Sequence, residues 1–167
     1  MSSRSLFLVG LIVAFMHLAV PVAMADIGVE KVNRTSGKPG ASVKLTVGCG
    51  ACAAVGVQEP PASFPVSLVP AGKVPRPHRC GANALCPPRV RAIPRRAPFT
   101  YLGEARPIGD ENVDEPYPLY VLDFAIPQLP AGTYTYVIYC DLCLDGKGGS
   151  LITEPNANGA WRLRIHP

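Results

Sequence analysis

The stretch LPAGTYTYVIYC at residues 129–140 decides the fold class of this 167-residue chain. A Pro-Ala-Gly turn leads into residues 133–139, each of which is β-branched or aromatic, the composition that β-strands favour. The chain also has 19 prolines and 16 glycines, which interrupt it too often for long helices. We therefore predict a strand at 133–139 within an all-β fold.

Further short runs on both sides of this stretch have strand character. In one of them, Val43, Leu45 and Val47 alternate with polar residues, which is the period of a half-buried strand. Besides 133–139, the expected strands are 27–32, 42–47, 64–69, 99–102, 118–126, 150–153 and 160–165. The residues expected in the core are Val43, Leu45, Val47, Val66, Leu68, Tyr134, Trp161 and Leu163. Seven or eight short strands joined by Pro/Gly turns predict an antiparallel sandwich.

The first 25 residues have the organisation of a secretory signal peptide. Arg4 precedes an apolar run at 6–20, and the small residues Ala23 and Ala25 stand where a signal peptidase requires them. Cleavage would start the mature chain at Asp26 and leave one domain at 26–167; because Arg4 is lost, the net charge would fall from +4 to +3. An uncleaved signal anchor is the alternative, and the only route by which we expect membrane contact. We therefore expect a protein that is secreted or held at the cell envelope.

Residues 70–98, named here the basic segment, interrupt the rhythm of strands and turns. The segment contains seven prolines, Lys73 and no acidic residue. Its arginines are Arg76, Arg79, Arg89, Arg91, Arg95 and Arg96. We expect a long loop here, an unusual feature in a compact domain. Residues 104–115, which follow, contain five acidic residues and a single basic one, Arg106, so the two segments either fold over each other or contact partners separately.

The order of turns and strands resembles that of immunoglobulin-like domains exported by bacteria, particularly actinobacteria. The resemblance is carried by 37–43 leading into a strand that ends at Cys49, and by 129–134 leading into a strand that ends at Cys140. The steps at 141–143 and 148–152 match as well. The resemblance implies a Greek-key sandwich that serves adhesion, ligand contact or spacing at the envelope, usually without catalysis. It also implies that Tyr134 forms a tyrosine corner.

Six cysteines, an even number, remain in the chain after cleavage, which in an exported protein favours disulfides. Two C-x-x-C pairs, Cys49 with Cys52 and Cys140 with Cys143, each follow a predicted strand. We expect the two pairs to meet at one end of the sandwich, where they can be cross-linked as 49–140 and 52–143. Self-closed pairs, 49–52 and 140–143, are the alternative.

Two other chemistries are open to the same four cysteines. As thiolates they form a ligand set for tetrahedral zinc, although zinc-ribbon pairs usually stand about 15–20 residues apart. One C-x-x-C could instead be a redox dithiol, but neither is followed by the helix that lowers the thiol pKa in such proteins. We therefore favour disulfides.

Cys80 and Cys86 flank five residues inside the basic segment, a spacing that predicts a local disulfide. His78 with Cys80 and Cys86 could form a partial metal site, so an exported metal-binding protein is our alternative function. In the favoured interpretation no metal and no cofactor is expected.

The sequence indicates a binding module rather than an enzyme. It contains no G-x-S-x-G, H-E-x-x-H or P-loop lysine motif, so we expect no catalytic residue. Arginines suit the recognition of oxyanions, so the six in the basic segment are candidates for contact with an acidic polymer outside the cell. No aromatic residue stands among them, which argues against specific nucleic-acid binding. A solvated loop balanced by the acidic residues after it is the alternative.

Overall fold

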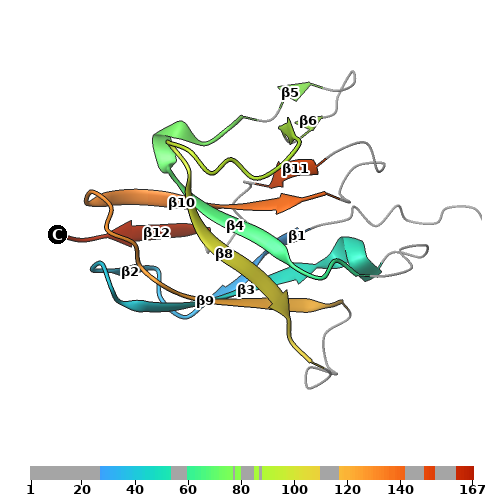
Figure 1. Ribbon diagram of the computed structural model, residues 1–167, viewed down its shortest axis with the longest axis horizontal. Coiled ribbons are helices and arrows are strands. Elements are labelled where there is room, and N and C mark those ends of the chain that lie inside the picture. Colours follow the sequence, from blue (N-terminus) through green and yellow to red (C-terminus); the bar gives the residue numbers. More distant parts are fainter. Residues whose placement is uncertain are drawn as a thin grey trace, which may run out of the picture.

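A computed structural model describes residues 27–53, 60–76, 78–79, 85–86, 88–109, 117–141, 149–152 and 161–167. These residues form an all-β structure of two layers (Figure 1). The first layer contains β1 (Ile27–Val32), β3 (Ser42–Cys49), β9 (Leu119–Ala125) and β8 (Thr100–Pro107), in that order. The second contains β4 (Phe64–Pro70) and β10 (Gly132–Cys140), with β11 (Gly149–Ile152) and β12 (Arg162–Ile165) on the far side of β10. The all-β prediction is confirmed.

Eight strands of four or more residues stand where the sequence predicted strands. The two-residue strands β2 (Ser36–Gly37), β5 (His78–Arg79), β6 (Leu85–Cys86) and β7 (Arg89–Val90) are additional. The strand pairs are antiparallel except β2 with β12, which is parallel. β11 pairs with the C-terminal part of β10 and β12 with its N-terminal part, so together they form one interrupted edge.

Strand β8 connects the two layers. It pairs with β4 over Thr100–Ala105 and with β9 at Arg106 and Pro107. The pairing with β4 skips one residue between Tyr101 and Gly103, and Gly103 has a φ of 142°, a conformation that glycine adopts without a Cβ penalty. A bulge of this kind bends a strand, which allows β8 to turn from one layer into the other.

The main core fills the space between the layers. All eight residues predicted for the core are buried, including Trp161 at 2 % and Tyr134 at 6 % exposure. In β12 the exposed Arg162 and Arg164 alternate with buried neighbours, as the period of a strand requires. The hydroxyl of Tyr134 donates to the carbonyl of Pro130 at 2.9 Å, the local contact that a tyrosine corner makes.

The basic segment has more regular structure than the expected loop. After β4 the chain forms a 3-10 turn, η3 (Ala71–Lys73), then the β5–β6 hairpin, and then β7, which pairs with β11 at the edge of the second layer. Part of the segment therefore adds to the sheet instead of standing free of it.

Candidate functional site

The basic segment lies against the outer face of the second layer through a small second core. Ile93, at 7 % exposure, packs with Val69 of β4, Val137 of β10 and Leu151 of β11. Val69 and Val137 point away from the main core because side chains alternate along a strand. The sheet thus carries apolar residues on both faces, and the basic segment covers the outer one.

Two hydrogen bonds hold the same part of the segment. The amide of Leu151 donates to the carbonyl of Pro88 at 3.0 Å, and the Tyr139 hydroxyl donates to the carbonyl of Arg91 at 2.8 Å. The Tyr139 ring also occupies the space where Gly149 would carry a Cβ, so a glycine is needed there for this ring position. Residues 88–93 are therefore fixed to β10 and β11 by both polar and apolar contacts.

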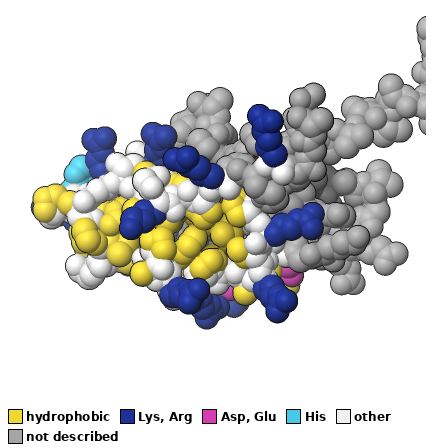
Figure 2. All heavy atoms as spheres, turned by 90° about the horizontal axis from the view of Figure 1, so that it is seen from above, with side chains coloured by type: hydrophobic (Ala, Val, Ile, Leu, Met, Phe, Trp, Pro, Cys, Tyr) yellow, Lys and Arg dark blue, Asp and Glu magenta, His cyan; other side chains and the backbone are white. Residues whose placement is uncertain are grey.

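All six arginines of the basic segment are exposed. Seen from above Figure 1, the molecule presents hydrophobic side chains surrounded by Lys and Arg, which outnumber the acidic side chains in this view (Figure 2). We call the six arginines and the surface between them the basic face. Its charges stand on a segment that the second core holds in place.

Arg95 has the most elaborate surroundings on this face. Its guanidinium lies 4.3 Å from the centre of the Tyr101 ring. The Tyr101 hydroxyl donates to Oε1 of Glu104, and the Ser63 hydroxyl donates to Oε2 of the same carboxylate at 2.9 Å. Partial burial first, and then Glu104, raises the pKa of Tyr101, so the ring remains a neutral hydrogen-bond donor at ordinary pH.

The bulge in β8 is what brings Tyr101 and Glu104 together. In a regular strand, residues three apart point to opposite faces. The extra residue at the bulge shifts the alternation by one position, so Tyr101 and Glu104 point to the same side. Of the five acidic residues at 104–115, Glu104 is the one that the structure describes, because residues 110–116 lie outside the described part of the chain.

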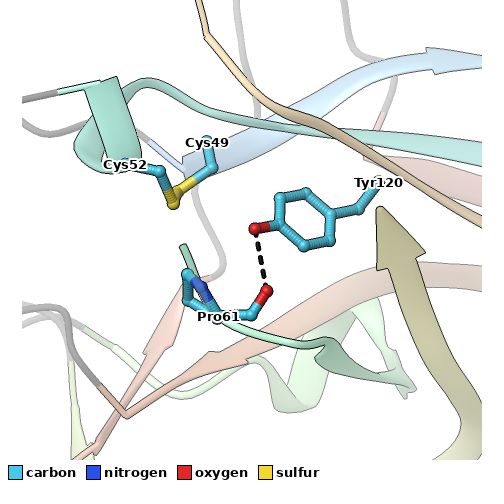
Figure 3. Close-up of a disulfide and its surroundings, with 4 residues drawn as sticks. All are labelled: Cys49, Cys52, Pro61 and Tyr120. Carbon is cyan, nitrogen blue, oxygen red and sulfur yellow. Dashed lines mark hydrogen bonds between the residues drawn. A yellow bond between two sulfur atoms is a disulfide. The ribbon is translucent and has the colours of Figure 1, made fainter. Parts of the chain in front are cut away.

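The first cysteine pair closes on itself. Cys49 and Cys52 form a disulfide with a Cα–Cα distance of 5.3 Å (Figure 3). This is the self-closed alternative, and it excludes the cross-links 49–140 and 52–143. The reason is the 3-10 turn η2 (Gly50–Ala53), which directly follows β3. In a 3-10 turn residues three apart stand on the same side, so Cys52 comes back over Cys49.

The other cysteines are only partly described. Cys140 is also disulfide-bonded, and its partner is neither Cys49 nor Cys52, since those are bonded to each other. An oxidised Cys49–Cys52 pair cannot supply two thiolates, so the four-cysteine zinc site does not form. The 140–143 and 80–86 pairings and the site at His78 involve side chains outside the described residues.

The surroundings of the Cys49–Cys52 disulfide are mainly apolar. Cys49 is fully buried in the main core and Cys52 is partly exposed. Nearby, the Tyr120 hydroxyl donates to the carbonyl of Pro61 at 2.9 Å, and burial raises the pKa of Tyr120 (Figure 3). These contacts lie at the end of the sandwich where β3 ends. The disulfide therefore has a structural role, because it holds the chain that leaves β3 against the main core.

Sequence reasoning identified the arginines but missed what holds them. Ile93, Tyr101 and Tyr139 had no predicted role in holding the segment, and Glu104 was expected only as one of the acidic residues of 104–115. For Ile93 a signal existed, because it is the one large apolar residue between Val90 and Phe99. Among the described residues, no set of three or more His, Cys, Asp or Glu side chains is placed to hold a metal, and no helix there could span a membrane.

Comparisons with protein-family models, with curated proteins and with solved structures find no match to this chain.

Proposed function

We propose that this chain is an exported, non-enzymatic immunoglobulin-like module that binds an acidic polymer at the cell envelope or outside the cell. The export signal at 1–25, the disulfide and the oxyanion chemistry of arginine all support this function. The observation that carries it is the packing of the basic segment on the second layer. The arginines of a free loop would move with the loop, whereas the contacts of residues 88–93 fix part of this segment to the sheet and so order the backbone that carries Arg89 and Arg91.

The strand order supports the immunoglobulin-like part of the proposal. Constant-type immunoglobulin domains place strands A, B, E and D in one sheet and C, F and G in the other. Taken in chain order, β1-β3-β9 correspond to strands A, B and E, and β4-β10-β12 to C, F and G. The β8 strand takes the place of strand D but pairs with β4 as well as with β9, and β11 is an additional strand beside β10. The basic segment then occupies the connection between the third and fourth strands.

The experiment measures binding of the oxidised protein to immobilised dextran sulfate, with neutral dextran as the reference. In the test variant, Arg76, Arg79, Arg91 and Arg96 are replaced by Gln, which leaves Arg95 in place. The matched control replaces four exposed cations around β1 and β3 by Gln in the same way: Lys31, Arg34, Lys38 and Lys44. Both variants lose the same charge, so only the location differs.

We expect the test variant to lose most of its binding while the control keeps it. Each arginine that contacts the polymer releases counterions, so the dependence of log affinity on log salt should flatten by up to about one unit per arginine. Equal losses in both variants would contradict the proposal, because they would show that net charge alone acts. An absence of binding to acidic polymers would refute it altogether.

A further inference from the structure

The Arg95 side chain lies on an aromatic support. Its guanidinium lies over the Tyr101 ring at 4.3 Å, a distance at which a cation and the face of a ring attract each other. The N–H groups of a guanidinium lie in its plane and point outward, so a guanidinium that lies over a ring can still donate hydrogen bonds to a ligand.

The Tyr101 ring is itself held in place. Its hydroxyl donates to Glu104, and the carboxylate of Glu104 is held on its other oxygen by Ser63, which precedes β4. Both Glu104 oxygens thus accept from hydroxyl groups. The chain of contacts Ser63–Glu104–Tyr101 fixes the ring on which Arg95 lies.

The backbone around Arg95 is also anchored. Ile93, two residues earlier, is buried in the second core, and the amide of Phe99 donates to the carbonyl of Arg96 at 3.0 Å. An arginine loses rotamer freedom when it binds a ligand, which costs binding free energy. Because the contact with Tyr101 already restricts Arg95 before binding, this side chain loses less rotamer freedom on binding than a freely moving arginine would.

We infer that Arg95 is the specificity-determining residue of the basic face, and that it binds an oxyanion through two parallel N–H···O bonds. The inference rests on the proposed function and names the chemistry of the ligand: a group with two accepting oxygens, such as a sulfate, phosphate or carboxylate carried by the polymer. Only a guanidinium presents two donors with the spacing of such a pair of oxygens; an ammonium acts as a point charge.

The test is the substitution of Arg95 by Lys, which keeps the charge but removes the planar pair of donors. Dextran sulfate, inorganic polyphosphate and poly-glutamate are the probes, one for each type of oxyanion. We expect R95K to bind the recognised probe roughly tenfold more weakly than the native protein, close to the loss in R95Q. The matched control, R96K, should remain within about twofold, and the probe on which R95K loses most identifies the oxyanion.

Substitutions of Tyr101 test the contribution of the ring separately from that of the Arg95 charge. Y101L removes the ring and should weaken binding nearly as much as R95K, whereas Y101F keeps the ring and should lose less. Thermal unfolding of each variant is the control that checks whether the fold is retained. Native-like affinity of R95K for all three probes would overturn this inference yet leave the proposed function standing, provided the four-arginine variant still loses binding. If the native protein binds none of the probes, both fail.

Discussion

Replacing Ile93 by Ala tests whether the basic segment is held against the sheet. Ile93 is 7 % exposed and packs on Val69, Val137 and Leu151, which lie on three different strands. The substitution removes three carbon atoms from the second core and leaves the arginines unchanged. Any change in the free energy of unfolding is therefore due to the packing of the segment, because no charged residue is altered.

The expected loss follows from the atoms removed. At about 0.8 kcal/mol for each buried methylene-sized group, three such groups contribute about 2.4 kcal/mol. A cavity would add to this value, but a small core at the edge of the domain relaxes more easily than the main core, so we expect a total of about 2–3 kcal/mol. A loss of 2.4 kcal/mol corresponds to roughly a 60-fold change in an equilibrium constant.

Urea unfolding measures this loss, with the fluorescence of Trp161 as the signal. Trp161 is the one tryptophan and is buried at 2 % exposure in the main core, so it reports the unfolding of the whole domain. The control, Ile108→Ala, removes the same atoms from a partly exposed residue outside the second core and should cost less than Ile93→Ala, about 1 kcal/mol. If Ile93→Ala changed the free energy of unfolding by no more than this control, the basic segment would not be packed as described.

Three further predictions concern other parts of the fold. Non-reducing peptide mapping should find Cys49 bonded to Cys52, and a peptide linking either residue to Cys140 would contradict the structure. The Tyr136 hydroxyl is buried and has no hydrogen-bond partner among the described residues, and burial raises its pKa above the usual 10.0, so the folded protein holds this proton more tightly than the unfolded chain does. Stability should therefore fall as the pH rises above about 10, and Tyr136→Phe should reduce this fall by up to about 1.4 kcal/mol per pH unit, as measured by urea unfolding at pH 9 and 11. Gly103→Ala should cost about 1–3 kcal/mol in the same assay, because the φ of 142° is unfavourable for alanine and its Cβ would lie 3.0 Å from Leu122; an unchanged stability would argue against the bulge.

Most of the fold could be predicted because its strands bury one face. Alternation such as that of Val43, Leu45 and Val47 depends on the period of the strand alone, so it is visible without knowledge of the tertiary structure. Strand β8 was predicted only in part, as 99–102, although it extends to Pro107. Its second half contains Gly103 and Glu104, which have little strand propensity, and it is pairing with β4 and β9 that makes it a strand.

The site was harder to predict because its contacts depend on local irregularities. Residues 101 and 104 meet only because of the bulge at Gly103, and no period in the sequence shows a bulge. The Cys49–Cys52 disulfide likewise depends on a single 3-10 turn after a strand. Sequence reasoning placed both cysteine pairs at strand ends but could not decide between bonds within a pair and bonds between pairs, since either choice satisfies the spacing.

The most direct test of the central claim locates the ligand on the protein. In an NMR titration of the isotope-labelled, oxidised protein with a short dextran sulfate, we predict that amide shifts concentrate in the basic segment and at Tyr101. Residues 31–44, which carry the exposed cations around β1 and β3, should change little. Shifts that concentrate at 31–44, or that spread evenly over all exposed cations, would contradict the claim that the basic segment is the binding surface.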